Sequence, residues 1–418
     1  MTIKTSKTAN RSPIKFYTLG GSNGVGKHSL FFKLKNLNVL IDPGIQSNTD
    51  GVDVRKKNFD KLDAILLTHA HIDHIGALIA VMENHPQVRV YCTAATKMLV
   101  EQAFNKRPDI SPPNLDLFMK RIYAMKYKDA FCLGRGIDIS FIHAGHILGS
   151  ASIIINTPEG NYLVTGDFAT EARGLLHPFI APDLDLRGLI SEGSLVGHNF
   201  PSATRGQDHF LGEVGRLIEN NQQIILPTDC LSVFQEMAII ISQEQTKGKF
   251  PDCPIFINNW LKDSFSAYAE HSSSLFLARE NSKKIGWNFM VLEPFYSGSN
   301  PESLGRFCYF AGPAHLKRSF PKDFAGKIVE QGGVMVTDSR LSSSQVKKRV
   351  LPQRKMKGNI AQLKCSNHIS GADLSSLIEQ MRPENVVLIH GQKHALGRFG
   401  RKLSMPSSVA EIGEEIKL

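Results

Sequence analysis

The chain has 418 residues, of which 42% are hydrophobic and 21% are charged. This length is typical of two or three domains, and the composition is that of a folded globular protein, so a disulfide-stapled miniprotein and a disordered chain are both excluded. Lysine and arginine number 49 against 39 aspartate and glutamate residues, and the resulting net charge of +10 favours a polyanionic partner such as nucleic acid, with an inert basic surface as the alternative.

The six cysteines are scattered singly, and none forms a Cys-x-x-Cys pair. This pattern argues against a zinc knuckle and against a secreted disulfide framework. The first residues are polar and basic, and no stretch approaches the length of apolar sequence that spans a membrane. We therefore expect a cytoplasmic protein that does not enter the membrane.

The first predicted elements are short strands around a glycine-rich turn. Residues 14–20, 28–34 and 38–44 have strand character, and the glycine-rich residues 20–27 separate the first two. This turn resembles a phosphate-binding loop, but His28 stands where Ser or Thr is required, and a strand rather than a helix follows. A Walker loop is therefore not predicted.

The next predicted unit is a buried strand at 64–67, a polar turn, and one amphipathic helix that carries Ile75, Leu78, Ile79 and Met82. Strand patterns return at 139–143, 151–157 and 161–167, with turn residues at 158–161. These strands predict a hairpin that leads into a second polar turn.

From residue 197 to 359 the pattern changes to alternating helices and strands. Helices are predicted near 210–220 and 234–245, and strands at 224–228 and 254–258, which indicates an α/β layer with its own parallel sheet. A strand at 359–365, a helix at 372–381, a strand at 385–391 and a basic helical tail follow.

One segment stands out by charge. Residues 345–357 hold six basic side chains and no acidic one, so they could follow a phosphate backbone, although such runs are also common on solvated faces. The candidate substrate-binding residues are Lys347, Lys348, Arg349, Arg354, Lys355 and Lys357.

The strongest chemical signal is the run His69-Ala70-His71-Ile72-Asp73-His74 directly after the buried strand. Three imidazoles and a carboxylate within six residues are the ligands expected for zinc or a similar divalent ion. Because the side chains of adjacent residues such as Asp73 and His74 diverge, the four groups cannot all reach one tetrahedral ion. Two ions a few ångström apart are therefore predicted.

Further ligands are expected at the ends of other strands. His146, Asp167 and His390 each follow an apolar strand and precede a glycine or a short turn. A lone histidine in such a place is often structural, but together the three complete two coordination spheres. The first predicted metal site comprises His69, His71, His146 and Asp167. The second comprises Asp73, His74, Asp167 and His390.

With these residues the sequence resembles the metallo-β-lactamase fold hydrolases, whose successive motifs match Asp42, the histidine run, His146 and Asp167. The resemblance implies an α/β protein with an αββα sandwich. The α/β insert resembles that of the β-CASP branch, whose three special motifs match Glu192, His368 and His390. The implied domains are the first part of the metallo-β-lactamase domain at 1–196, a β-CASP insert at 197–359, and the last part of the metallo-β-lactamase domain at 360–418.

Members of this branch are nucleases, and the histidine at position 390 resembles the RNA-directed members. Residues 143–152 are similar to the corresponding stretch of the cleavage and polyadenylation endonuclease subunit and its prokaryotic relatives. The resemblance implies a two-metal ribonuclease that acts as an endonuclease, a 5′ exonuclease or both. A DNA-directed nuclease, a small-ester metallohydrolase and a non-enzymatic RNA-binding scaffold stay open as alternatives.

The resemblance also implies roles and partners. Asp73 would serve catalysis as a ligand, Asp42 would orient the site or merely cap its turn, and His368, oriented by Glu192, would protonate the leaving oxygen. The expected cofactors are two divalent ions, Zn²⁺ in the first place and Mn²⁺ as the alternative. The expected partner is single-stranded RNA, while protein partners and a homo-oligomer stay open.

Three stretches depart from the pattern of the branch. Residues 227–236 lack its arginine and have Ser232 and Val233 at the centre, residues 337–341 replace an SSGML-like loop, and residues 193–198 differ from the common pattern after Glu192. None of these changes touches a predicted metal ligand, so they bear on the choice of substrate.

Overall fold

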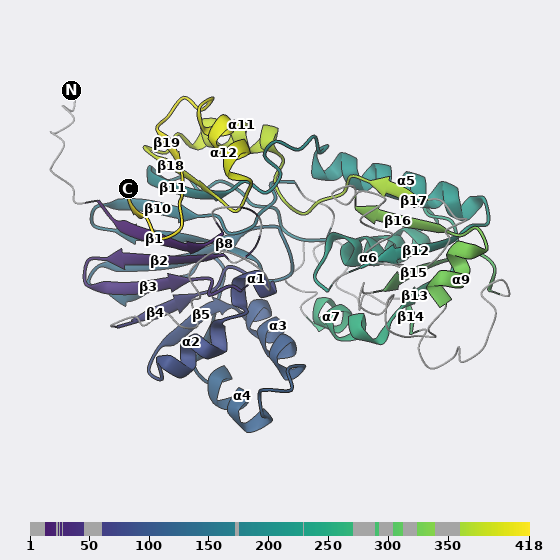
Figure 1. Ribbon diagram of the computed structural model, residues 1–418, viewed down its shortest axis with the longest axis horizontal. Helices are drawn as coiled ribbons and strands as arrows, with labels where there is room; N and C mark the ends of the chain where they lie inside the picture. Colours follow the sequence, from purple (N-terminus) through teal and green to yellow (C-terminus); the bar gives the residue numbers. More distant parts are fainter. Residues whose placement is uncertain are drawn as a thin grey trace.

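The computed structural model describes residues 13–21, 24, 26, 28–45, 61–171, 175–228, 230–270, 289–291, 304–311, 324–338 and 360–418. Two seven-stranded sheets pack face to face with helices on their outer sides, and a third sheet of six strands lies beside them with its own helices (Figure 1). The predicted class, an αββα sandwich with an inserted α/β domain, is confirmed.

The first sheet has the strand order β20-β1-β2-β3-β4-β5-β6. Its β20, β1, β2 and β3 pair antiparallel, whereas β3 to β6 run parallel. The strands are β1 (Lys15–Gly20), β2 (Ser29–Leu34), β3 (Leu37–Ile41), β4 (Ala64–Leu66), β5 (Arg89–Thr93), β6 (Ile122–Met125) and β20 (Glu415–Lys417).

The second sheet has the order β19-β18-β11-β10-β9-β8-β7. Strands β7 to β10 pair antiparallel, with β9 and β10 forming the predicted hairpin, and β10, β11, β18 and β19 run parallel. The strands are β7 (Ala130–Gly134), β8 (Ile137–His143), β9 (Ala151–Thr157), β10 (Gly160–Val164), β11 (Leu186–Glu192), β18 (Val386–Ile389) and β19 (Ser407–Val409).

The main core lies between these two sheets. Alternate residues of each strand point inward, so Phe16 and Phe32 of the first sheet meet Phe141 and Ile153 of the second without exposure to solvent. Helices α2 (Leu78–Asn84), α3 (Ala94–Asn105) and α4 (Pro112–Met119) cover the outer face of the first sheet, and α11 (Gly371–Met381) and α12 (Lys393–Gly400) cover that of the second. Among the described helices, none has both the length and the apolar character needed to cross a membrane.

The single helix predicted after the histidine run is wrong. The chain forms a short helix α1 (Ile72–Ile75), bends, and begins α2 at Leu78. The bend is dictated by packing, because a Cβ on Gly76 would lie 2.2 Å from the side chain of Ile45, and Ala77 donates its N–H to Pro43 O at 2.8 Å. The metal-ligand turn is thereby held against the loop that follows β3.

The third sheet is entirely parallel, as predicted, with the order β14-β13-β15-β12-β16-β17. Its first helix begins at Ala203, well before the predicted start, because Ser202 caps it by accepting the N–H of Arg205. The strands are β12 (Gln223–Pro227), β13 (Ile255–Ile257), β14 (Phe289–Val291), β15 (Phe307–Ala311), β16 (Val334–Asp338) and β17 (Ile360–Leu363). The helices are α5 (Ala203–Glu219), α6 (Val233–Thr246), α7 (Asn259–Glu270) and α9 (Phe324–Glu330).

The domain boundaries at 196 and 359 stay predictions, although β17 pairs with β16 inside the third sheet. The predicted helical tail is wrong beyond α12, since β19 and β20 extend the edges of the two sandwich sheets. Ile14 and Leu418 exchange backbone hydrogen bonds at 2.9 and 3.0 Å, which ties the C-terminal residue to the first strand.

The intersheet core predicts a position-dependent cost of truncation within β2. Phe32 is fully buried and stacks on Phe16 with ring centroids 5.0 Å apart, so Phe32→Ala should lower the free energy of unfolding by about 3–5 kcal/mol. The neighbouring Lys33 points to solvent, and Lys33→Ala should change it by no more than about 0.5 kcal/mol. Urea unfolding of both variants measures the difference, and equal losses would contradict the assignment of the two faces.

Candidate metal centre and active site

The predicted site residues meet at one edge of the sandwich, where its parallel strands end. Asp42 follows β3, the histidine run follows β4, Asp167 follows β10, and His390 follows β18. The carboxyl ends of parallel strands lie at the same edge of a sheet. Because the two sheets pack with these edges on the same side, the side chains that follow the strands of both sheets lie close together. His146 reaches the same edge from the loop between β8 and β9.

The first cluster consists of His69, His71, His146 and Asp167, whose ligand atoms all lie within 4.8 Å of one another. The Nδ1 of His71 is 3.1 Å from His69 Nε2 and 3.2 Å from His146 Nε2, and Asp167 Oδ2 lies 3.7 and 3.6 Å from the same two Nε2 atoms. Ligands about 2.1 Å from a tetrahedral ion are about 3.4 Å apart, so these spacings fit one such ion.

The second cluster consists of Asp73, His74, Asp167 and His390. Asp73 Oδ2 lies 3.9 Å from His74 Nε2 and 3.5 Å from His390 Nε2. Asp167 Oδ2, which faces the first cluster, also lies 3.6 Å from His74 Nε2. The carboxylate of Asp167 therefore faces both clusters.

The imidazoles of the first cluster are oriented through their far nitrogens. His146 Nδ1 lies 3.0 Å from Asn367 O, His71 Nε2 lies 3.0 Å from Leu231 O, and His69 Nδ1 lies 3.0 Å from Thr68 Oγ1. Each far nitrogen thus donates its proton to an oxygen, which leaves a lone pair on the nitrogen that faces the cluster.

Asp42 provides the corresponding partner for His74. Its Oδ2 lies 2.9 Å from His74 Nδ1 and accepts Thr68 Oγ1–H at 2.6 Å, while its Oδ1 accepts the N–H of Thr68 at 2.8 Å. Asp42 is fully buried and has a φ of +54°, a left-handed conformation that is uncommon for aspartate. These contacts match an orienting role better than a simple turn cap.

The structure tests whether a cation fits this place. His74 Nε2 is fully buried, points between Asp73 and Asp167, and has no hydrogen-bond partner among the described residues. A buried polar nitrogen without a hydrogen-bond partner is costly, and a cation bound there would satisfy it. The donor set of imidazoles and carboxylates at ligand spacing therefore fits a pair of divalent ions.

The electrostatics agree with this fit. Burial lowers the pKa of His69 and of His146 well below the usual range, so both rings are neutral and can act as ligands. Burial alone would raise the pKa of Asp73, but the imidazoles of His74 and His390 outweigh it and hold that carboxyl ionised. The pKa of His390 rises to about 10, because the carboxylates of Asp167 and Asp73 outweigh the effect of its burial. These carboxylates therefore stabilise positive charge at the second cluster.

His390 differs from the other imidazoles in its contacts. Its Nε2 lies 3.2 Å from the backbone nitrogen of Gly26, and its Nδ1 lies 3.0 Å from Asp167 Oδ1 and 3.1 Å from Ser194 Oγ. Its φ of +53° is left-handed. The structure thus brings His390 to the second cluster, but both of its nitrogens already contact protein atoms.

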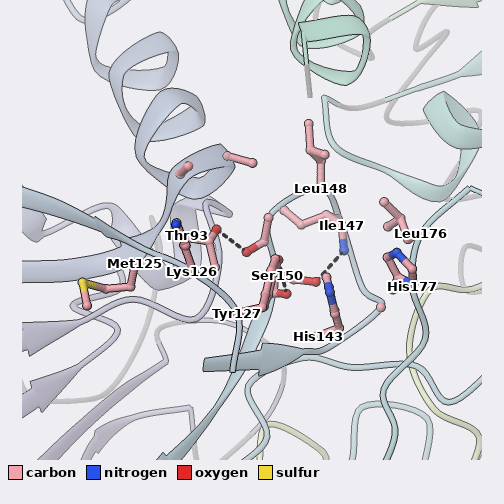
Figure 2. Close-up of a pocket in the computed structure, with 14 residues that line it drawn as sticks. Thr93, Met125, Lys126, Tyr127, His143, Ile147, Leu148, Ser150, Leu176 and His177 are labelled. Carbon is pink, nitrogen blue, oxygen red and sulfur yellow. Dashed lines mark hydrogen bonds between the residues drawn. The ribbon is translucent and has the colours of Figure 1, made fainter. Parts of the chain in front are cut away.

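A cavity of about 200 Å³ lies behind the loop that carries His146, and its wall fixes that loop (Figure 2). Thr93 Oγ1 donates to Gly149 O at 2.7 Å, and Tyr127 OH donates to Ser150 O at 3.0 Å. Ser150 Oγ accepts the N–H groups of His146 and Ile147 at 3.1 and 3.2 Å. His146 is therefore held from behind as well as through its ring.

Glu192 and His368 form a pair beside the clusters. His368 Nδ1 lies 3.0 Å from both carboxylate oxygens of Glu192 and 4.0 Å from Asp167 Oδ2. Glu192 is fixed in turn, because its Oε1 accepts the N–H of Phe168 at 2.8 Å and its Oε2 accepts Ser194 Oγ–H at 2.5 Å. The pair is thus positioned to hold or deliver a proton next to the clusters.

A second cavity of about 640 Å³ is lined by His368 and by residues of the histidine run, and it lies between the sandwich and the domain built on the third sheet, which we call the third-sheet domain. We call this cavity the interdomain cavity. Apolar side chains make up much of its wall, and its polar groups include Gln102, Lys106 and Asn367. The Nζ of Lys106 lies 3.0 Å from Asp263 Oδ2. The apolar lining residues include Ile72, Leu99, Ala103, Leu231 and Val233.

His28 lies beside the clusters although it is not among the predicted site residues. This residue is fully buried, its Nδ1 lies 3.3 Å from Asp42 Oδ2, and its ring stacks on His74 with centroids 4.7 Å apart. Its backbone N–H donates to Asp73 O at 2.8 Å. The sequence signal was weak, since a single histidine at the start of a strand is seldom functional.

The predicted substrate-binding residues lie outside the described residues, so the structure does not place them. They are Lys347, Lys348, Arg349, Arg354, Lys355 and Lys357. Of the departing residues at 337–341, only Thr337 and Asp338 are described, at the end of β16.

Comparison with protein families matches two regions of the chain. Residues 23–201 match the metallo-beta-lactamase superfamily, and residues 353–418 match the Zn-dependent metallo-hydrolase RNA specificity domain. The described parts of these regions contain the two clusters together with Glu192 and His368.

Curated relatives are similar over much of the chain. The RNase J-like protein of Methanocaldococcus jannaschii is 23% identical, over 91% of this chain and 93% of its own length. The endoribonuclease ysh1 of Emericella nidulans is 22% identical over 93% of this chain and 52% of its own length. The transcription termination factor FttA of Methanococcus maripaludis is 24% identical over 68% and 46%. The matches thus span only about half the length of the last two relatives.

A solved structure shares the fold. The crystal structure of a protein of unknown function from Enterococcus faecalis superposes with a TM-score of 0.62 and 16% identity, over 97% of this chain and all of the other. The matched regions and the paired His and Asp clusters support divalent metal binding. The chain thus contains a metallo-β-lactamase superfamily domain at residues 23–201 and a Zn-dependent metallo-hydrolase RNA specificity domain at residues 353–418.

Proposed function

We propose that this protein is a two-metal ribonuclease that hydrolyses phosphodiester bonds of single-stranded RNA in RNA processing or decay. The observation that carries the proposal is the Glu192–His368 pair, in which His368 Nδ1 lies 4.0 Å from the Asp167 carboxylate that faces both clusters. Hydrolysis of a phosphodiester needs stabilisation of the charge on its oxygens and a proton for the leaving oxygen. Ions held by the two clusters would supply the first, and His368 would supply the second. The RNA specificity match at 353–418 and the relatives' names support RNA as the substrate.

The first cluster would hold one ion and the second cluster the other, with Asp167 between them. Two divalent ions bound there supply Lewis acidity and lower the pKa of water. Imidazole and carboxylate ligands at tetrahedral spacing favour Zn²⁺, with Mn²⁺ as the alternative. The cytoplasm, expected from the scattered cysteines, stays a prediction.

The chain's own residues then perform three tasks. Asp42 holds the His74 ring with its Nε2 toward the cluster, and Glu192 holds His368 as the proton donor for the leaving 3′-oxygen. The interdomain cavity would take the nucleotide next to the cut, while the basic excess of the chain attracts the phosphates farther along the strand. The sequence has no aromatic-rich pattern for reading bases, so selectivity among RNA sequences should be weak.

The apolar wall of the interdomain cavity favours a second candidate, a small-ester hydrolase. Leu231 and Val233 lie where a nucleic-acid site would be expected to offer positive charge, and the resemblance places an arginine in this segment. A DNA-directed nuclease with the same clusters is the remaining alternative. The substrate comparison below separates the three.

The first prediction concerns metal content and substrate. The wild-type chain should hold about two ions by elemental analysis and should cut single-stranded RNA but not the matching DNA. Asp73→Ala removes a ligand of the second cluster alone, so it should retain about one ion and lose at least ~10³-fold in rate. Asp129→Ala removes an exposed carboxylate and serves as the matched control.

RNA labelled at the 5′ or the 3′ end gives the direction of attack in the same assay. Cleavage of DNA at an equal rate would replace the proposal with the DNA nuclease. Two bound ions with hydrolysis of a small ester and of no nucleic acid would replace it with the ester hydrolase.

The second prediction concerns the proton donor. His368→Ala should keep both ions and lower kcat by about 10²–10⁴-fold, because His368 acts on the leaving oxygen and not on the metals. His394→Ala removes an exposed histidine and should leave kcat unchanged. An unchanged kcat in His368→Ala would remove His368 from the mechanism.

The third prediction concerns the basic segment at 345–357, which we propose as an RNA-binding segment. Replacing its six basic residues with Gln should weaken RNA binding at low salt and flatten its dependence on salt, by about 0.7 in log–log slope for each phosphate that the variant no longer neutralises. Filter binding at several salt concentrations measures the slope. Gln at Lys33, Lys35 and Lys61, which lie at the edge opposite the clusters, provides the control. Equal slopes in both variants would show that the segment does not touch RNA.

A further inference from the structure

A loop of the third-sheet domain contacts a residue of the first cluster. The carbonyl oxygen of Leu231 lies 3.0 Å from His71 Nε2, while the Nδ1 of the same ring faces His69 and His146. His71 therefore depends on the third-sheet domain for the orientation of its ring, whereas His69 and His146 are oriented by Thr68 and Asn367. Among these three imidazoles, His71 is also the most exposed.

The carbonyl of Leu231 points at His71 because the backbone there is unusual. Leu231 has a φ of +59°, a left-handed conformation that a branched side chain seldom adopts. Such a conformation persists only where neighbouring contacts impose it. The contact that imposes it is a hydrogen bond of 2.6 Å from the N–H of Leu231 to Oε1 of Gln235.

Gln235 is well suited to hold this loop. Its side chain is fully buried in the first turn of α6, and its backbone N–H donates to Ser232 Oγ, the cap of that helix. Helix α6 is buried along most of its length in the third-sheet domain, so its first turn is a rigid support. The Nε2 of Gln235 has no hydrogen-bond partner in the part of the chain that the structure describes, so Oε1 carries its contact with the loop.

We propose that Gln235 is a positioning residue for the first metal ion: it holds Leu231 so that the Leu231 carbonyl fixes the His71 ring with Nδ1 toward the cluster. This inference rests on the proposed two-metal site. On this proposal the third-sheet domain contributes to metal binding as well as to the interdomain cavity. The same loop, residues 230–233, lines that cavity, so the substrate surface and the metal ligand share one support.

The test measures metal affinity in the full-length chain rather than activity alone. Gln235→Leu removes the acceptor at nearly constant volume, and Gln235→Glu keeps an oxygen at the same place. Co²⁺ is titrated into the metal-free protein in competition with a chelator, and its visible absorption reports the ligands of each site. Zn²⁺ content by elemental analysis and the thermal midpoint of the metal-free protein are measured in parallel.

Two control variants separate positioning from general damage. Gln243→Leu makes the same exchange later in α6, away from the loop. Ser232→Ala removes the helix cap but leaves the acceptor of Leu231 in place. Both should lower the thermal midpoint at most modestly and should bind two ions as the wild type does.

In Gln235→Leu the affinity of the first site should fall about 10–100-fold, as for other residues that orient a metal ligand, while the second site stays within about twofold. Gln235→Glu should restore the wild-type affinity and spectrum. Wild-type affinity at both sites in Gln235→Leu, or an equal loss in Ser232→Ala, would overturn the inference. A wild-type chain that binds no metal would instead overturn the proposed function on which it rests.

Discussion

The carboxylate of Asp167 is the group on which the whole site depends. It lies within 4.0 Å of five imidazole rings that come from four separate segments of the chain. Those rings belong to His69, His74, His146, His368 and His390. A buried carboxylate is stable only when paired, and so many partners can be brought to one carboxylate only where strands of two sheets end at the same edge. The packing of the two sheets is therefore what allows this one buried charge to be surrounded.

This arrangement is tightened by the backbone around it. Gly166, directly before Asp167, has a φ of +57°, and a Cβ there would lie 2.7 Å from Thr68. This close approach brings Gly166 of the second sheet against Thr68 of the first. Thr68 is held in turn by Asp42, to which it donates its N–H and its hydroxyl. Asp42 orients His74, whose Nε2 returns to Asp167. A closed set of contacts thus links both sheets, so a substitution at any of these residues should alter the position of the Asp167 carboxylate.

The sequence allowed the central part of this site to be predicted, because a run of histidines after a buried strand is seldom anything but a metal site. Asp167 and His390 could be added since each follows an apolar strand, and the structure brings both to the predicted place. The resemblance to a known family was needed for Glu192 and His368, which no local pattern marks. His28, the break at Gly76 and the strands near the C-terminus were beyond prediction, because tertiary packing, not local pattern, determines each of them.

The contact between Leu231 and His71 shows why such a site is difficult to predict in full. It is made by a backbone carbonyl, which every residue has, so its identity is hidden from the sequence. What matters is the left-handed conformation of Leu231, and that is set by Gln235 from the following helix. The segment that departs from the branch pattern at Ser232 and Val233 thus also contains Gln235, the residue that holds the Leu231 backbone. Substrate contacts can change in this loop while the same backbone continues to hold the ligand, provided that the glutamine stays in place.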